Sequence, residues 1–350
     1  MTTATAIEQA EMRVAMTRKD SAGRVLGILL LVAAFAWLLA NLVTAPSQFF
    51  NSLLFGTGNG ALYALIALGY TLVYGIIELI NFAHGDLFML ATVFSGFMMT
   101  YWLGAVEPSP QSWAMMLLTL VAAMGFGAVV NVVIERVAYR RLRRAPKLAA
   151  LITAVGMSFI LQWVGLKWNG SAPRQWPTVV PEGGIEIRDV TLQYTTIMVV
   201  AFTIPVLLLL TYLVQRTKQG KAMRATAQDQ DAARLMGINV DRTIAFTFAL
   251  GGAMAGAAGL LFLESVGTTR YDAGFQLGLI AFTAAVLGGI GNLAGAVLGG
   301  FLIGIIQGLN DGLPYGLGQK WSQTVVFTIL ILVMVFRPTG ILGQPTVEKV

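Results

Sequence analysis

Long apolar segments separated by short polar connections restrict most strongly how this chain can fold. We read these segments as 25–43, 62–80, 87–101, 113–134, 148–166, 193–214, 243–263, 275–287, 294–309 and 321–336. About 20 apolar residues in helical conformation cross the hydrocarbon layer of a bilayer. Hydrophobic residues make up 56% of the chain and charged residues 11%, whereas a soluble domain carries about 25% charged residues. The sequence predicts an all-α, polytopic membrane bundle of about eight to ten transmembrane helices, some of them broken or re-entrant.

Basic residues gather in the polar connections rather than along the whole chain. Most of the 23 Lys and Arg residues lie in the N-terminal arm, in two loops at 136–147 and 216–242, and in the tail. Cytoplasmic loops carry this excess of basic residues, so both termini are predicted to be cytoplasmic. The net charge of +6 therefore reflects membrane topology and not nucleic-acid binding. We expect 25–43 to be an uncleaved anchor, with a signal peptide as the alternative.

Two polar or glycine-rich breaks interrupt the apolar pattern. The first, Asn81-Phe82-Ala83-His84-Gly85-Asp86, contains the only histidine and is either a cytoplasmic turn or a break inside the membrane. The second is Gly288-Gly289-Ile290-Gly291-Asn292. One histidine, no cysteine and one nearby aspartate are too few ligands for a metal. We therefore expect His84 to be a turn residue, Asp86 to be the N-cap of the next helix, and the chain to hold no metal.

The loop 219–242 is the most informative polar stretch. Its pattern predicts one helix over 222–236, stopped by Gly237. Asp231-Ala232-Ala233, followed by Gly237, resembles the EAA loop of ATP-binding-cassette importer permeases, with Asp in place of Glu and without the usual Ile-x-Leu-Pro ending. In that family the loop is a short coupling helix seated on the ATPase. The alternative is a solvated amphipathic helix with no partner.

Three motifs together carry a more specific resemblance. They are YALIALGYTLVYGI with INFAHGD at 63–86, the run ARLMGIN at 233–239, and AFTAAVLGGIGNLAGAVLGGFLIG at 281–304. In this order they resemble the permeases of high-affinity branched-chain amino acid importers. Urea-importer permeases belong to the same broader family and typically differ around 63–70. The N-terminal extension and Glu78 depart from the pattern, so a urea or short-amide permease stays open.

The resemblance implies a membrane permease subunit that carries branched-chain or related hydrophobic amino acids by alternating access, in the bacterial inner membrane. The implied partners are a second homologous permease, two ATP-binding subunits, an extracytoplasmic substrate-binding protein and membrane lipid. ATP and Mg²⁺ would bind those ATPases, and this chain would bind no cofactor. The implied organisation is a cytoplasmic extension at 1–24, a permease domain at 25–337 and a cytoplasmic tail at 338–350. The predicted coupling residues are Asp231, Ala232, Ala233, Arg234, Gly237 and Ile238.

A permease for a zwitterion must satisfy a carboxylate and an ammonium group away from water. Broken helices can do so with free backbone groups at their half-helix ends. We therefore expect the two breaks to line the substrate path, with these residues along it: Tyr63, Asn81, Gly85, Gly289, Gly291 and Asn292. The competing interpretation is that the glycines only permit close helix crossings and that both asparagines cap helices.

The sequence contains no motif that indicates an enzyme. The chain has no G-x-x-x-x-G-K-[ST] motif, so it does not bind ATP by a P-loop itself. It has no cysteine, and no paired ionisable residues mark a catalytic site within the apolar segments. A secondary carrier or channel that works without an ATPase remains the alternative from another class.

Overall fold

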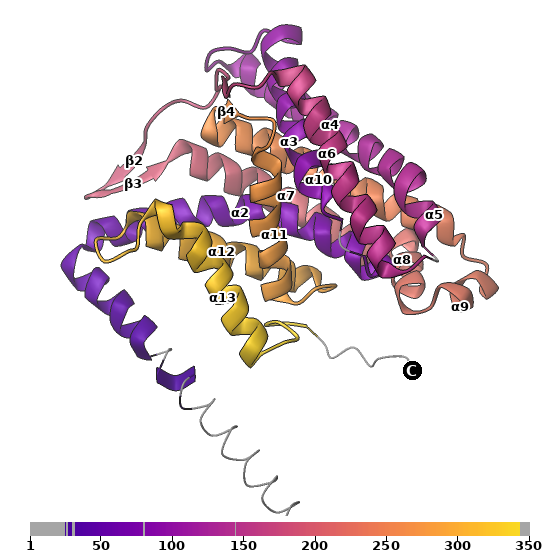
Figure 1. Cartoon of the computed structure of the whole chain (residues 1–350). Coiled ribbons are helices and arrows are strands. Elements are labelled where there is room, and N and C mark those ends of the chain that lie inside the picture. The colour runs from indigo at the N-terminus through magenta and orange to yellow at the C-terminus, as the bar shows by residue number, and fades with distance from the viewer. Residues whose placement is uncertain (1–24, 26, 30–31, 80, 144, 344–350) are drawn as a thin grey trace, which may run out of the picture.

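The computed structural model describes residues 25–343, apart from positions 26, 30, 31, 80 and 144, and Figure 1 shows that these residues are mostly helical. Within this part, 8 helices are long and apolar enough to cross a membrane. These findings confirm the predicted polytopic helical bundle. The predicted extension at 1–24 and the end of the tail from 344 onward lie outside the described residues.

An apolar helix at Gly27–Thr44 precedes the labelled elements. The helices are α2 (Pro46–Ile77), α3 (Ala83–Phe97), the π-helix η1 (Met98–Trp102), α4 (Pro110–Ile134), the π-helix η2 (Glu135–Tyr139), α5 (Arg140–Leu142), α6 (Lys147–Asn169), α7 (Tyr194–Arg216), α8 (Lys218–Gln228), α9 (Gln230–Leu235), α10 (Val240–Val266), α11 (Ala273–Gly288), α12 (Leu293–Gly312), the 3₁₀ turn η3 (Gln319–Trp321) and α13 (Ser322–Phe336). The strands form two antiparallel pairs: β1 (Arg174–Gln175) with β4 (Thr268–Thr269), and β2 (Gly184–Ile187) with β3 (Val190–Gln193).

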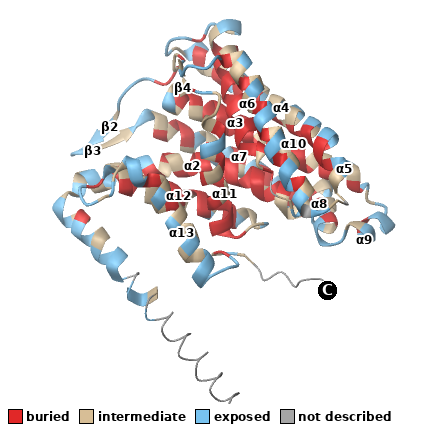
Figure 2. Ribbon diagram, in the orientation of Figure 1, coloured by how far each residue is buried: buried red, intermediate tan, exposed pale blue. Residues whose placement is uncertain are grey.

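Helices α2 and α10 form the centre of the bundle. In their most apolar windows, 83% of the residues of α2 and 72% of those of α10 are buried, against 11% for the last span and 6% for Gly27–Thr44. Figure 2 shows the buried residues concentrated on the inner helices and the exposed residues on the outer ones. Lipid is as apolar as a leucine side chain, so burial here reports close packing rather than escape from water.

Glycines allow a close crossing between α2 and α12. A Cβ atom added to Gly304 would lie 2.2 Å from the backbone nitrogen of Gly60, and one added to Gly60 would lie 2.8 Å from the Cα of Phe301. Backbones that approach this closely gain dispersion contacts along their whole length. The many glycines in the apolar segments therefore help to set the distance between the central helices.

Helix α2 is longer than the sequence predicted. It begins at Pro46, with the proline in the first turn, whereas the apolar pattern placed its start at Leu62. Proline lacks a backbone N–H and suits the first helical position, where that group would have no partner. Between these two points α2 carries small and polar residues, such as Gly58, which packs against Thr196 of α7. Packing against other helices, not hydrophobicity, extends α2.

The first break also differs from the prediction, because its polar residues lie largely inside a helix. Helix α2 ends at Ile77 and α3 begins at Ala83, so His84 is in the first turn of α3 and not in a loop. Asp86 is not the N-cap either. It is buried and accepts hydrogen bonds from the hydroxyl of Ser158 and, at 3.2 Å, from the side-chain amide of Gln162. These partners on α6 allow a carboxylate to lie within the bundle.

The polar connections separate toward two ends of the bundle. In Figure 1, α5, α8 and α9 gather at one end, whereas the β2–β3 hairpin lies toward the other. The two basic loops of the sequence, which contain α5 and α8–α9, therefore lie near each other in space. This arrangement agrees with the charge pattern that led to the topology prediction. The side of the membrane on which this end lies stays a prediction.

Candidate functional site

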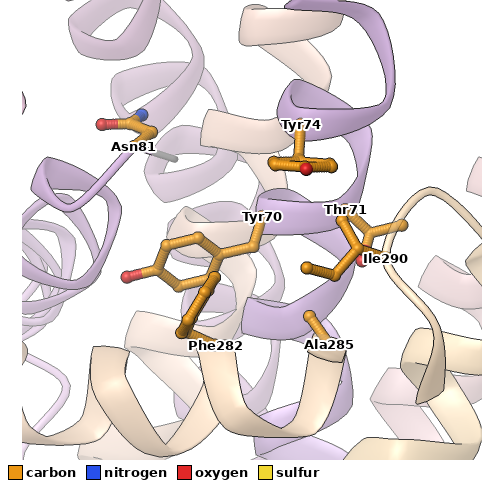
Figure 3. A pocket seen from close by; sticks show the side chains of 7 residues that line it. All are labelled: Tyr70, Thr71, Tyr74, Asn81, Phe282, Ala285 and Ile290. Carbon is orange, nitrogen blue, oxygen red and sulfur yellow. The ribbon is translucent and has the colours of Figure 1, made fainter. Parts of the chain in front are cut away.

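A small cavity lies between the two helix breaks, shown in Figure 3. Residues from α2, from the segment before α3, from α11 and from the segment before α12 surround it. They are Tyr70, Thr71, Tyr74, Asn81, Phe282, Ala285 and Ile290. The structure thus brings together one residue from the first predicted break, Asn81, and one from the second, Ile290. Segments more than 200 positions apart in the sequence meet here.

The cavity is narrow in this conformation. Its empty space is about 220 Å³, but a water-sized sphere can be centred in only about 10 Å³ of it, which is room for about one water molecule. Most of its wall is aromatic or aliphatic. A small amphipathic molecule has suitable contacts in such a site, although it can enter only when the helices around the cavity move apart.

Asn81 takes part in a buried hydrogen-bond network beside this cavity. Its side-chain oxygen accepts from the hydroxyl of Tyr139 at 2.9 Å, and its amide nitrogen lies 3.5 Å from the side-chain oxygen of Asn131. Asn131 in turn donates to the backbone carbonyl of Phe248 on α10 at 2.7 Å. The network links the first break to α4, η2 and α10. No N-cap bond from Asn81 accompanies the start of α3, whose cap position is Phe82.

The second break is stabilised by the residues that follow α13. The last carbonyls of α11, on Leu287 and Gly288, each accept a hydrogen bond of 2.9 Å, from the amides of Ile341 and Leu342 respectively. Asn292 caps α12 by accepting from the amide of Gly295 at 3.1 Å, and it donates to the carbonyl of Leu342 at 2.8 Å. The predicted substrate path needs free backbone groups at the second break. In this conformation, the carbonyls of Leu287 and Gly288 and the amide of Gly295 are already hydrogen-bonded within the protein.

The glycines of the second break differ in their surroundings. Gly289 and Gly291 have φ angles of 107° and 90°, which favour glycine because other residues rarely adopt them. A Cβ atom on Gly289 would lie 2.4 Å from the nitrogen of Gly343, whereas one on Gly291 would meet no atom within 4 Å. Gly289 thus permits the close approach of the residues after α13, and Gly291 faces open space.

Tyr63 and Gly85 lie outside the group that lines the cavity. The Tyr63 hydroxyl donates to the side-chain oxygen of Gln307 on α12 at 2.6 Å, and Tyr63 is about 10 Å along α2 from Tyr70 at 1.5 Å per residue. Gly85 faces α11, where an added Cβ atom would lie 2.4 Å from the carbonyl oxygen of Gly274. Its position matches the close-crossing interpretation. A role for either residue in the path stays a prediction.

Sequence reasoning missed most of the cavity wall and its supporting network. Asn131 and Glu135 are polar residues inside an otherwise apolar run, 113–134 and its continuation. Such residues are costly in a membrane and mark sites of function or packing, so this signal was available. Tyr70, Thr71 and Phe282 gave no comparable signal, because tyrosine, threonine and phenylalanine are common in apolar helices.

The loop between α7 and α10 forms two helices and not the single predicted one. Helix α8 ends at Gln228, and Asp229 begins α9 by accepting hydrogen bonds from the amides of Asp231 and Ala232 at 2.9 and 3.0 Å. An aspartate side chain competes for backbone amides in this way and favours caps over helix interiors. The predicted stop is confirmed, since Gly237 has a φ angle of 81° directly after α9.

The predicted coupling residues lie on and just after α9, with different degrees of exposure. Asp231 and Arg234 are exposed and form an ion pair at 2.9 Å. Ala233 is buried against the bundle, and its carbonyl accepts from the amide of Ile238 at 3.0 Å. The remaining predicted residues, Ala232 and Gly237, are exposed. Helix α9 is thus attached by its alanine face and presents its other faces outward.

Two apolar side chains that the sequence analysis did not select lie at the end of α9. Leu235 and Met236 are 90% and 82% exposed, more than any other large hydrophobic side chain in the described part of the chain. They occur in a polar loop at the end of the bundle where α8 and α9 lie (Figure 1). Adjacent exposed apolar side chains are typical of a contact surface for another protein.

An ion-pair cluster connects the start of α10 to the π-helix η2. Arg143 contacts both Glu135, whose side chain is 1% exposed, and Asp241, at 2.6 Å. Arg140 also contacts Asp241, at 2.7 Å. Because η2 also carries Tyr139, the cluster and the Asn81 network are joined through one turn of π-helix. In the described part of the chain, no three His, Cys, Asp or Glu side chains gather in a way that could hold a metal ion.

Comparison with known proteins identifies the family. Residues 52–335 match the family model described as "Branched-chain amino acid transport system / permease component". The chain belongs to this permease family. It is 40% identical over 307 residues to the high-affinity branched-chain amino acid transport system permease protein BraD of Pseudomonas aeruginosa, covering 87% of this chain and 98% of BraD. The permease protein LivH of Escherichia coli K12 is 40% identical over 309 residues, covering 87% of this chain and 97% of LivH.

A more distant relative carries a different name. The autoinducer 2 import system permease protein LsrC of Escherichia coli is 27% identical over 202 residues, covering 55% of this chain and 56% of LsrC. Family membership and the apolar helices together establish a multi-pass membrane permease. The resemblance inferred from the three sequence motifs is confirmed.

Proposed function

We propose that this permease is the membrane-spanning subunit of an ATP-binding-cassette importer for branched-chain or related hydrophobic amino acids. The observation that carries the proposal is the 40% identity, over 87% of the chain, to permeases named for branched-chain amino acid transport. The cavity between the helix breaks supports it, because an aliphatic amino acid suits aromatic and aliphatic walls with a few polar groups.

Energy would come from a partner that contacts α9. The pair Leu235 and Met236 gives such a partner an apolar anchor, and the exposed ion pair of Asp231 with Arg234 gives the contact a polar edge. Anchors of this kind carry most of the energy of an interface, and the polar edge excludes water. A push on α9 would reach α10 through Ala233 and the ion pairs of Asp241, and from there η2 and Asn81.

The complete importer would contain a second homologous permease, two ATP-binding subunits and an extracytoplasmic substrate-binding protein, set in the lipid of the bacterial inner membrane. ATP and Mg²⁺ would bind the ATPase subunits, and this chain would act by alternating access without a cofactor of its own. The path would pass the cavity, with Asn81 beside it. In this account the chain is a transport subunit and not an enzyme, and the end carrying α8 and α9 is cytoplasmic, together with both termini.

Uptake of radiolabelled leucine by whole cells tests the proposal. Cells that lack this chain should lose uptake, a plasmid copy should restore it, and loss of the partner ATPase should abolish it again. Excess unlabelled isoleucine or valine should compete with the label. Uptake that persists without the ATPase would favour a secondary carrier, and competition by urea but not by isoleucine would favour a urea permease. Either result would contradict the proposal.

A further inference from the structure

The hydroxyl of Thr71 on α2 is buried without a hydrogen-bond partner in the described part of the chain. Threonines in helices can donate to the carbonyl four residues earlier, and two buried threonines of neighbouring helices do so here. Thr92 donates to Phe88 and Thr283 to Leu279, both at 2.9 Å. Thr71 departs from this pattern, so its hydroxyl is available to another group.

Thr71 lines the cavity between the helix breaks, so its free hydroxyl can meet a molecule in that cavity. The other buried hydroxyls that lack a partner, on Thr100, Thr203 and Thr226, do not line the cavity between the helix breaks, whereas Thr71 does. Figure 3 shows its side chain next to Ile290, with Ala285 nearby on the facing helix. The side chains of both neighbours are aliphatic, so neither can form a hydrogen bond with Thr71.

Leaving a hydroxyl unsatisfied in an apolar site is unfavourable. The cost is absent only in a state in which the hydroxyl has a partner. The narrow cavity has room for about one water, and the same space widens if α2 separates from α11 and from the segment before α12. A polar group of a passing molecule would then replace the water.

We propose that the Thr71 hydroxyl is a direct contact for the polar head group of an aliphatic amino acid as it passes between the two helix breaks. The rings of Tyr74 and Phe282 and the side chain of Ile290 contact the aliphatic part of the same molecule. This inference rests on the proposed function. It identifies Thr71 as the residue that hydrogen-bonds to the polar end of the substrate. Thr71 acts during passage and not in the narrow form of the cavity.

The test uses the complete importer in proteoliposomes, with its ATPases and its substrate-binding protein, and labelled leucine. Thr71→Val keeps the shape of the side chain and removes only the hydroxyl, and Thr71→Ser keeps the hydroxyl. Thr92→Val is the matched control, since Thr92 is equally buried but bonds within its own helix. Thermal unfolding of each variant in detergent shows whether the fold is intact.

The maximal rate of leucine uptake should fall at least fivefold in Thr71→Val and stay within about twofold of wild type in Thr71→Ser and Thr92→Val. The leucine concentration for half-maximal uptake should change little, because the substrate-binding protein sets it. A folded Thr71→Val importer with the wild-type rate would overturn the inference, leave the proposed function intact, and assign the hydroxyl to a water only. Failure of the wild-type importer to transport leucine would instead overturn the proposed function, and the inference with it.

Discussion

Buried polar side chains are the residues that give this apolar bundle its specific interior. Asn81 hydrogen-bonds to both Asn131 and Tyr139. Glu135 pairs with Arg143 near the end of the same run. Each of these groups would be costly in lipid without its partner. Their positions thus fix how α4, η2 and α10 meet the first helix break.

Replacing Tyr139 with Phe tests the Asn81 network. The change removes one hydroxyl and leaves the Asn81 side-chain oxygen without its donor, so the free energy of unfolding should fall by about 1–3 kcal/mol. Unfolding by denaturant in mixed micelles measures this value. Tyr212→Phe is the control, because Tyr212 is exposed on α7, and it should change stability by less than about 0.5 kcal/mol. Equal effects of the two changes would show that the network adds nothing to stability.

The ion-pair cluster provides a second comparison within one site. Arg143→Ala leaves Glu135 buried without its cation, so we expect a loss of about 3–5 kcal/mol. Arg140→Ala breaks only the pair with Asp241, whose two side chains are 49% and 46% exposed, and should cost about 0–1 kcal/mol. The same unfolding assay applies. Similar losses in both variants would mean that Glu135 is hydrated and not dependent on Arg143.

Among the elements, the α2–α12 crossing depends on the absence of side chains. Gly304→Ala places a methyl group 2.2 Å from the backbone nitrogen of Gly60, and overpacking of this kind costs about 1–3 kcal/mol. Gly156→Ala on α6 meets no atom within 4 Å and should instead gain about 0.5–1 kcal/mol from helix propensity. Thermal unfolding of both variants in detergent checks the opposite signs. A stable Gly304→Ala variant would contradict the crossing.

Element boundaries show where sequence reasoning succeeds and where packing decides. The long apolar runs predicted the spans, because the bilayer itself imposes that pattern. They failed at Pro46, where α2 starts well before the predicted Leu62, and at His84 and Asp86, which lie inside α3. They also failed at Asp229, where one side chain divides the predicted coupling helix. At Asp86 and Asp229, side-chain hydrogen bonds that hydropathy does not describe determine the local structure.

For the candidate site, the sequence predicted the two breaks but little of the wall. Asn81 and the glycine-rich segment before α12 do meet at one cavity. Asn292 was a candidate contact and caps α12 in the structure, and Tyr63 bonds to Gln307 away from the cavity. The wall residues come from ordinary apolar helices, and only the crossing of α2 with α11 brings them together. The residue pattern of one helix does not show which other helix packs against it.

Three parts of the molecule are connected through a series of contacts. The exposed pair Leu235 and Met236 lies at one end, the ion pairs of Asp241 and Arg143 lie between, and the cavity beside Asn81 lies within the bundle. A partner that moved α9 would therefore act on the cavity from a distance. This arrangement is useful for transport only if α9 faces the compartment that holds ATP.

Labelling of a single cysteine tests that requirement most directly, because the natural chain contains no cysteine. In Leu235→Cys, expressed with the rest of the importer, a membrane-impermeant maleimide should react in inverted inner-membrane vesicles and not in intact spheroplasts. Adding purified ATPase subunits to vesicles stripped of them should slow the reaction at least fivefold. Labelling from the outside of spheroplasts would contradict the account, since no ATPase could then reach α9.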